Sequence, residues 1–350
     1  MPVSGPYGVG EFARCSAIAS AALERWPQAS VHFLLSRHAP YIAKVPFPVT
    51  RLPASATFHS AEVIEFMRRW RPDVVIFDNA GRTAQLEAAQ RLGARLVFIS
   101  SRPRQRRRAF RLAWMRLLDE HWIAYPKLIA GGLGLIERLK LTLLRRPAVR
   151  YLDVIMARAA NSTTTSARAA GPAVSGGNDV VVVPGGGTGH PGAEDAAHKF
   201  LAAARGLAAA GFATTFVGPT GDAGEPSNAA SSARLACTAS LPQADLAALM
   251  RSARLVIVNG GSTLLQAIAC GAACVAAPIA GDQRERIRAC AAAGVAMEAA
   301  AHAADLEAQA RRLLANEPAR AALAQRAAAL GLADGVQVAL DALERLRRRS

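Results

Sequence analysis

The feature that most constrains the fold of this chain is a repeated alternation between short apolar runs and longer stretches with helical periodicity. The strand-sized runs are Val31 to Leu35, Val74 to Phe77, Leu96 to Ile99, Val180 to Val183, Thr214 to Val217, Leu255 to Val258 and Ala273 to Ala277. Segments between them, such as Phe12 to Arg25 and Leu264 to Cys270, carry apolar residues at helical spacing. Strands that alternate with helices predict an α/β protein with parallel sheets covered on both faces.

The two sets of strands are separated by a stretch rich in Ser, Thr, Gly and Ala, which is typical of a linker. We therefore predict two doubly wound domains, residues 1–160 and 178–316, joined by a linker at residues 161–177. Residues 317–350 are predicted to form two helices, broken at Gly331 and Gly335, that pack back across the domain boundary. A length of 350 residues and an apolar content of 51% suffice for two cores.

Composition and charge exclude several classes of protein. The five cysteines lack the spacing of a zinc site and the even count of a secreted disulfide framework. The sequence starts without a secretion-signal pattern, and no run reaches the roughly 18 apolar residues of a membrane span. We therefore expect a cytoplasmic protein. The formal net charge of +16 favours an anionic partner, such as a phosphorylated substrate or a lipid surface.

Glycine-rich loops follow three of the expected strand positions: Gly5 to Glu11, Pro184 to His190 and Asn259 to Thr263. In open α/β sheets, ligands bind at the carboxyl ends of strands, where the amides of a helix start attract phosphate. Two such loops in the second domain predict a diphosphate there, although a lone glycine turn is more often only a tight connection. No loop has the Lys-Ser or Lys-Thr of a P-loop, and none is a clean dinucleotide fingerprint, which disfavours kinases and dehydrogenases.

The third loop continues in a way that favours a sugar nucleotide. After its helix come Gly271, a strand, Pro278, and the polar pair Asp282 and Gln283 at the start of the next helix. This order places Gln266 and the polar pair near one crevice. Their hydrogen-bonding groups suit the hydroxyls of a ribose or hexose.

This arrangement resembles the GT-B glycosyltransferases, in the branch that contains the MurG-like glucosaminyltransferase and the PseG-like nucleotide-sugar hydrolase. The segment from Gly8 to Cys15 is also similar to the PseG-like opening G-x-G-H-x-x-R-C, and Asp78 ends a strand as an acidic residue does in those proteins. The resemblance implies a GT-B fold, with two doubly wound parallel-sheet domains facing a cleft. It also implies that a nucleotide diphosphate sugar is the donor substrate, without a further cofactor.

The donor-site residues that this reasoning selects lie in the second domain. They are Gly186, Gly187, Thr188, Asn259, Gly260, Gly261, Ser262, Thr263, Gln266, Asp282 and Gln283. We expect the glycine loops to surround the diphosphate, and Gln266 and Gln283 to reach sugar hydroxyls. Gln266 replaces the usual glutamate of the family. No metal site is expected, because there is no D-x-D motif and the histidines and cysteines lack metal-ligand spacing.

An inverting transfer needs a base for the acceptor hydroxyl. Glu11, at the start of a helix in the first domain, is the first candidate and Asp78 the second. Each has an ordinary alternative: a helix dipole favours an acidic residue in its first turn, and an acidic residue after a strand can cap the next helix. Glu11 stands where the PseG-like proteins have a histidine, which argues against hydrolysis. Arg14, one turn later, is positioned to pair with Glu11.

A basic segment from Arg102 to Arg116 contains seven arginines together with Phe110 and Trp114, and residues 128–146 mix leucines with further basic residues. Membrane-surface helices have this composition, so we expect contact with an anionic membrane surface. A solvated basic face over a core helix is the alternative. Nucleic acid is disfavoured because few aromatic residues are available for stacking.

The expected function is an inverting, metal-independent hexosyl transfer in a bacterial protein at the inner face of the cytoplasmic membrane. The donor is expected to be UDP-linked and the acceptor to be a cell-envelope or lipid-linked molecule, both by resemblance. A nucleotide-sugar hydrolase and a non-catalytic sugar-nucleotide-binding protein remain as alternatives. Only residues 1–4 precede the first glycine loop, so the first strand is expected to be very short or to lie upstream of Met1.

Overall fold

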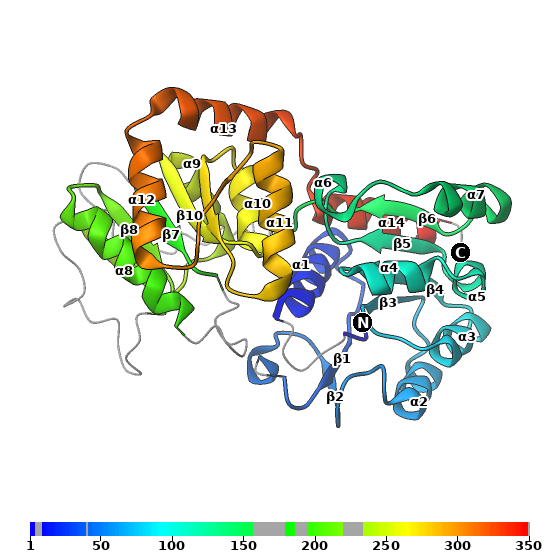
Figure 1. The fold of residues 1–350 in the computed structure, drawn as a ribbon. Helices are drawn as coiled ribbons and strands as arrows, with labels where there is room; N and C mark the ends of the chain where they lie inside the picture. Colours follow the sequence, from blue (N-terminus) through cyan, green and yellow to red (C-terminus); the bar gives the residue numbers. More distant parts are fainter. Residues whose placement is uncertain (4–8, 40, 157–178, 186–194, 220–233, 349–350) are drawn as a thin grey trace. The chain divides into compact units, whose positions relative to one another are not determined.

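A computed structural model describes the chain in two compact units (Figure 1). The described residues are 1–3, 9–39, 41–156, 179–185, 195–219 and 234–348. Unit 1 comprises Met1–Met156 and Ala333–Ser350, and unit 2 comprises Ala157–Leu332. Residues 161–177, predicted to be a linker, lie outside the described residues.

Unit 1 has a parallel α/β structure, as predicted from the alternation of strands and helices. Its elements are α1 (Val9–Arg25), β1 (Phe33–Ser36), the 3₁₀ helix η1 (Ile42–Lys44), β2 (Val49–Leu52), α2 (Ser60–Trp70), β3 (Val74–Asp78), α3 (Thr83–Arg91), β4 (Arg95–Ser100), α4 (Pro103–Ala109), α5 (Leu112–Leu117), β5 (Glu120–Ile123), α6 (Lys127–Ala130), α7 (Leu135–Leu144), β6 (Ala148–Tyr151) and α14 (Gly335–Arg347). The strands β3-β4-β5-β6 form one sheet and β1-β2 form another, and all their pairings are parallel.

A very short strand joins these two sheets. Pro2 bridges to Leu34 of β1, and Val3 bridges to Asp78 of β3, both in parallel. The backbone amide of Asp78 donates to the carbonyl of Pro2 at 3.1 Å. The order across unit 1 is therefore β2-β1-(Pro2–Val3)-β3-β4-β5-β6, and Pro2–Val3 lies where the first strand was expected.

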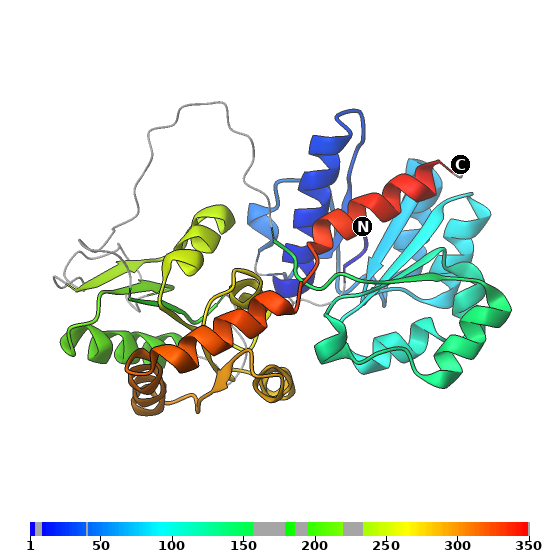
Figure 2. The same cartoon turned by 90° about the horizontal axis from the view of Figure 1, so that it is seen from above.

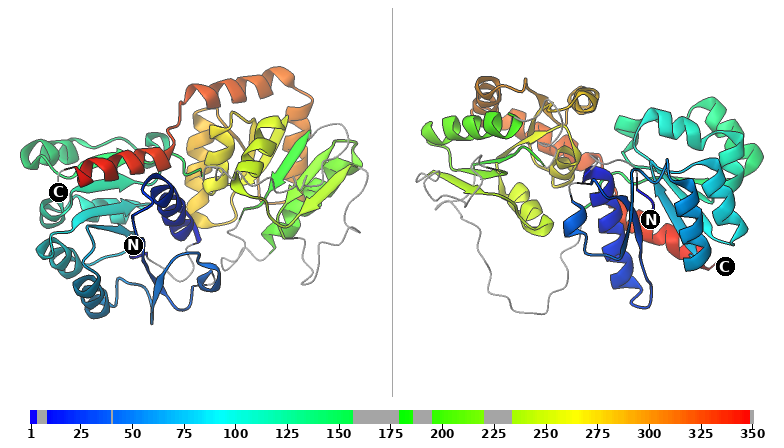
Figure 3. Two further views of the ribbon diagram at one scale, coloured as in Figure 1. Left: turned by 180° about the vertical axis from the view of Figure 1, so that it is seen from behind. Right: turned by 90° about the horizontal axis from the view of Figure 1, so that it is seen from below.

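Unit 1 has two cores, one on each face of its sheet, because successive side chains of a strand point to opposite faces. Phe77 packs with apolar residues of α2 and α3 on one face of the sheet, whereas Ile76 packs with residues of α1 and α14 on the other. Figure 2 shows α14 (red) beside α1 (blue), where Arg25 donates to Asp341 at 2.9 Å. Figure 3 shows α14 along the strands from behind, where it contacts β6. The last helix of the chain therefore completes the core of unit 1.

Unit 2 is a second doubly wound unit. Its elements are β7 (Val180–Val183), α8 (Ala196–Ala209), β8 (Thr214–Val217), β9 (Leu235–Thr238), α9 (Gln243–Ser252), β10 (Leu255–Asn259), α10 (Ser262–Ala269), β11 (Cys274–Ala277), α11 (Gly281–Ala292), β12 (Met297–Glu298), α12 (Ala303–Leu314) and α13 (Glu317–Ala329). The sheet order is β12-β11-β10-β7-β8-β9, all parallel. The chain builds outward from β7 on one side and from β10 on the other, so the topological switch point lies between these two strands.

Valines of β7 show how the sheet of unit 2 is buried. Val180 and Val182 belong to a core that includes Phe200 and Leu207 of α8 and Leu306 of α12. Helix α10 contacts β10 and β11, and helix α11 contacts β11 and β12 (Figure 1). Since all four residues of β7 are buried, the strand reads as a continuous apolar run, as parallel central strands do.

Candidate functional site

The switch point of unit 2 brings together the ends of β7 and β10, and one side chain joins them. Asn259, the last residue of β10, is 3% exposed. Its Nδ2 donates to the carbonyl oxygen of Pro184 after β7 at 2.5 Å, and its Oδ1 accepts from the amide of Gly261 at 2.8 Å. Because ligands of open α/β sheets bind at the carboxyl edge beside the switch point, Asn259 shapes the expected ligand site.

Glycine is required in both loops by close packing. A Cβ on Gly260 would lie 2.7 Å from the Cδ1 of Ile287 and 2.8 Å from the Cβ of Gln283. Gly185 has a φ of +78°, which L-residues rarely adopt, and a Cβ there would lie 2.5 Å from the Nδ2 of Asn259. Because Gly185 and Gly260 carry no side chain, the end of β7 packs closely against Asn259, and the loop after β10 packs closely against α11. This is a structural role, and it is compatible with ligand binding at the same place.

Gln283 holds the loop after β10 to the loop after β11. It is 6% exposed, and its Oε1 accepts hydrogen bonds from the amides of Gly260 at 3.1 Å and Ile279 at 3.0 Å. The sequence suggested that Gln283 reaches sugar hydroxyls, and the structure shows its carboxamide oxygen bound to these two amides. Arg286, which sequence reasoning missed, donates to the carbonyl of Gly260 and to Asp282 at 3.4 Å. Its four-residue spacing from Asp282 was the available signal.

The helix starts at this edge carry the remaining expected donor residues. Ser262 is exposed, Thr263 half-buried and Gln266 half-buried in α10, and Asp282 is exposed in the first turn of α11. The first turn of a helix leaves backbone amides without internal partners, which makes it an anion site. The other expected residues, Gly186, Gly187 and Thr188, lie outside the described residues.

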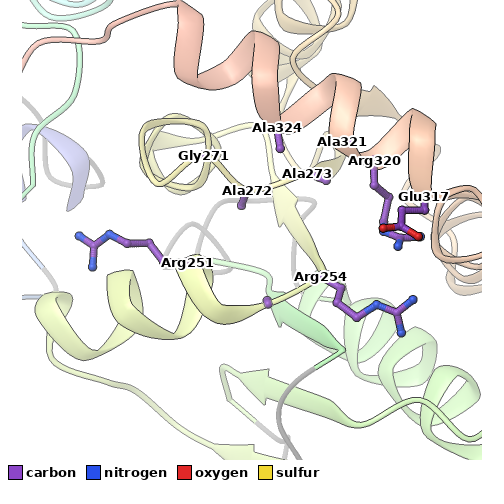
Figure 4. A pocket seen from close by; sticks show the side chains of 10 residues that line it. Arg251, Arg254, Gly271, Ala272, Ala273, Glu317, Arg320, Ala321 and Ala324 are labelled. Atoms are coloured by element: carbon purple, nitrogen blue, oxygen red, sulfur yellow. The ribbon is translucent and has the colours of Figure 1, made fainter.

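An open pocket in unit 2 lies at the amino ends of the strands of the same sheet, opposite to the ends that carry the glycine loops (Figure 4). Its lining includes Arg254 and Ala273, which directly precede β10 and β11, and residues of α13. Arg254 pairs with Asp179 at 2.7 Å, and Arg320 donates to carbonyls at the end of α12. Because the pocket lies at the amino ends of the strands, it is separate from the glycine loops.

In unit 1, Asp78 forms a buried ion pair at the end of β3. Arg14 donates to both of its oxygens, at 2.9 Å from Nε and 2.8 Å from Nη2, and the Cys15 thiol donates at 3.4 Å. Asp78 is 0% exposed. Burial raises the pKa of Asp78 to about 6 against the opposing effect of Arg14, so the group is ionised at neutral pH. The expected pairing of Arg14 with Glu11 is wrong, because Arg14 pairs with Asp78 instead.

Glu11 lies in the first turn of α1 and is 9% exposed. Its Oε1 accepts from the Nδ2 of Asn79 at 3.2 Å. Asn79 is held in turn by Ser101, whose amide donates to Oδ1 at 3.0 Å and whose hydroxyl lies 2.6 Å from Nδ2. Asn79 has a φ of +51°, a left-handed conformation that asparagine tolerates. These contacts hold an acidic side chain at the carboxyl edge of the sheet, where it can accept a proton.

The sequence did not predict Asn79 as part of this network, because the acidic Asp78 before it was the candidate residue at this position. Tyr41 is a second missed neighbour. Its ring stacks on Phe12 at 4.4 Å between centroids, and burial together with the negative charge of Glu11 raises the pKa of its phenol. Within the described ranges, no group of three or more His, Cys, Asp or Glu side chains could hold a metal ion.

The basic segment from Arg102 to Arg116 buries its aromatic side chains in unit 1, whereas five of its seven arginines are exposed. Phe110 and Trp114 are each 3% exposed, and Trp114 donates to Thr83 at 3.0 Å. Arg106 donates to Glu137 at 2.7 Å and to the carbonyl of Ala130 at 2.6 Å. The aromatic residues expected beside a membrane are therefore core residues. No helix among the described residues combines the length and the apolar character needed to cross a bilayer.

Comparison with known proteins gives matches to solved structures. No protein-family model matches the sequence, and no curated protein matches it. MurG of Acinetobacter baumannii is 13% identical, with a TM-score of 0.63 over 98% of both chains. The spinosyn rhamnosyltransferase SpnG in complex with thymidine diphosphate is 17% identical, with a TM-score of 0.58 over 99% of this chain and 98% of that one.

A third similar structure has a different chemistry. The putative UDP-N-acetylglucosamine 2-epimerase of Listeria monocytogenes is 15% identical, with a TM-score of 0.57 over 97% of this chain and 92% of that one. At these identities the likeness establishes architecture rather than activity. The chain thus has the GT-B fold of two doubly wound α/β units, as the sequence predicted.

Proposed function

We propose that this protein is a glycosyltransferase that takes a hexosyl unit from a nucleotide diphosphate sugar. The observation that carries the proposal is the side chain of Asn259, which joins Pro184 to Gly261 at the switch point of unit 2. This contact joins the end of β7 to the loop after β10 beside the first turn of α10. A helix start at a switch point suits a diphosphate, and similar structures include glycosyltransferases.

The hydrogen bonds within the loop specify where the diphosphate would bind. The amide of Gly260 already donates to Gln283, and that of Gly261 donates to Asn259. The amides of the first turn of α10, from Ser262 onward, are the ones that a helix start presents to a ligand. They and the helix dipole would stabilise the negative charge that develops on the departing nucleotide diphosphate, which needs no metal ion.

Glu11 would serve as the base of an inverting transfer. The acceptor hydroxyl gives its proton to the Glu11 carboxylate as its oxygen attacks the anomeric carbon, and the nucleotide diphosphate leaves. Asn79 orients that carboxylate through its hydrogen bond at 3.2 Å. Asp78 is less suited to this role because Arg14 occupies both of its oxygens. A UDP-linked donor and a cell-envelope or lipid-linked acceptor complete the proposal, on the sequence resemblance alone.

A ligand screen followed by product analysis tests this function. The purified chain is heated with UDP, GDP, CDP, ADP and TDP sugars, and we expect one nucleotide family to raise the melting temperature. Asn259→Ala should abolish the shift. Arg251→Ala, in the pocket at the opposite edge of the sheet, is the matched control and should keep it.

The products then separate the three candidate functions. A glycosyltransferase consumes the donor only when an acceptor is present. Release of free sugar from the donor in buffer alone would instead identify a hydrolase. Binding without turnover against a panel of lipid-linked and soluble acceptors would favour the non-catalytic reading, and no thermal shift with any sugar nucleotide would refute the donor site.

A further inference from the structure

Helix α7 exposes the most apolar side of its surface. Leu135, Ile136, Leu139 and Leu143 are 83%, 70%, 60% and 74% exposed. Among the described residues, four of the seven exposed large apolar side chains belong to this ten-residue helix. A contiguous exposed apolar patch, unlike scattered single residues, marks an interaction site.

The spacing of these residues places them on one stripe. At 100° per residue, Leu135, Leu139 and Leu143 follow one another at successive turns and Ile136 lies beside them, all within an arc of about 100°. We call these four residues the α7 stripe. A surface helix ordinarily turns such a stripe to the core, so α7 has the reverse orientation.

Polar contacts on the other side of the helix fix this orientation. Glu137 accepts from Arg106 at 2.7 Å, and Lys140 donates to the carbonyl of Phe110 at 3.1 Å. Helix α7 packs against α5 and lies at the edge of unit 1 (Figures 1 and 2). The inward side of α7 is therefore held by an ion pair and a backbone contact, and the α7 stripe faces outward.

The segment of the chain that contains α7 is strongly basic. Residues 102–146 contain twelve Arg or Lys and three Asp or Glu, a net formal charge of +9. Each of the three acidic residues is already paired: Asp119 with Arg146, Glu120 with Arg150 and Glu137 with Arg106. Arg138 of α7 and Arg145, which directly follows the helix, are exposed. A second copy of the chain would bring like charges together, whereas an anionic surface complements them.

We propose that α7 docks unit 1 on an anionic lipid bilayer. The α7 stripe inserts at the boundary between headgroups and acyl chains, and the surrounding arginines contact the lipid phosphates. This inference is independent of the proposed transfer reaction. It also replaces Phe110 and Trp114, which are buried, by exposed aliphatic side chains as the apolar part of the contact.

Vesicle co-sedimentation of the full chain tests the proposal. We expect binding to vesicles of phosphatidylcholine with 30% phosphatidylglycerol at low salt, at least tenfold stronger than to pure phosphatidylcholine. The triple variant Leu135→Gln, Leu139→Gln, Leu143→Gln should lose at least tenfold in affinity. Glutamine keeps the helix propensity, so an unchanged melting temperature will show that the variant folds. Phe58→Gln removes an equally exposed apolar side chain, 71% exposed, from another part of unit 1 and should bind like the wild type.

A second readout reports insertion itself. Leu139→Trp should show a blue-shifted emission on addition of anionic vesicles. The proposal is overturned if the wild-type chain stays in the supernatant with anionic vesicles at low salt, or if the triple variant binds like the wild type. It is also overturned if the stripe instead mediates self-association, seen as a concentration-dependent dimer that the triple variant abolishes while lipid binding persists.

Discussion

Arg14 and Asp78 form a bidentate ion pair in the interior of unit 1, with nitrogen to oxygen distances of 2.8 and 2.9 Å. The pair connects α1 to the end of β3, next to the short Pro2–Val3 strand. It therefore fixes the helix whose first turn carries Glu11. The carboxylate of Asp78 supports the arrangement of the candidate base by holding this helix in place.

The first prediction concerns this pair. Asp78→Asn would leave the buried charge of Arg14 without its partner, and breaking a buried ion pair costs about 3 to 5 kcal/mol. We expect urea unfolding to show a loss of this size. Asp341→Asn, which removes an exposed partner of Arg25, should leave the unfolding midpoint nearly unchanged. A stable Asp78→Asn variant that lost turnover while Glu11→Gln kept it would make Asp78 the base.

The strands that the sequence predicted are short runs made mostly of apolar or β-branched residues. β7 and β8 have the predicted bounds, and β10 extends the predicted run by Asn259. β5 escaped prediction because it begins with Glu120 and His121, which are 3% and 0% exposed. Glu120 is stabilised by Arg150 of β6, the neighbouring strand. An ion pair between neighbouring strands allows charged residues to lie inside the sheet. The sequence of β5 therefore lacks the continuous apolar run that predicts a buried strand.

The glycine positions located the candidate site, but the sequence left the partners of its polar residues undetermined. Asn259 and the two following glycines lie at the switch point because loops follow strands in a parallel sheet. Arg14 meets a carboxylate 64 residues away, and Gln283 meets an amide 23 residues away. Local spacing carries no information about such contacts, and for this reason the nearer Glu11 was the expected partner of Arg14.

The second prediction separates a ligand-facing residue from a positioning residue in the donor loop. Thr263→Ala should weaken nucleotide-sugar binding by about 0.5 to 1.5 kcal/mol, the contribution of one hydrogen bond, without a change in melting temperature. Gln283→Ala removes the acceptor of the Gly260 and Ile279 amides, so it should lower both affinity and melting temperature.

Calorimetry and thermal unfolding of both variants measure these effects. Gln283→Glu keeps an oxygen acceptor and should restore most of the melting temperature. If Gln283→Ala weakens binding but unfolds like the wild type, the side chain acts on the sugar directly. Unchanged affinity in both alanine variants would remove the donor-site assignment.

The third prediction addresses the base. Glu11→Gln should lower kcat by about 10²- to 10⁴-fold, the usual contribution of a positioned base, with little effect on donor affinity. Asn79→Gly removes the hydrogen bond to Glu11 while suiting the φ of +51°, so it should lower kcat less. Initial rates and donor titrations measure both. A Glu11→Gln variant with a near-normal rate would exclude this role.

The last prediction concerns acid stability through His121. Its side chain is 0% exposed and its Nε2 lies 2.8 Å from the hydroxyl of Ser100. Burial, and to a lesser degree the positive charge of Arg106, lowers the pKa of His121 to about 3. The unfolded chain binds this proton near pH 6.5, so the contribution to stability is complete above that pH and is lost as the pH falls towards 3. Within this window the free energy of unfolding should fall by up to about 1.4 kcal/mol per pH unit because of His121.

His121→Gln retains a partner for Ser100 without the titration, so the stability of this variant should depend less steeply on pH between 6.5 and 4. His38→Gln, at an exposed position, is the control and should keep the wild-type slope. Urea unfolding across this range decides the matter, because equal slopes for His121→Gln and the wild type would show that His121 does not carry the acid sensitivity of unit 1.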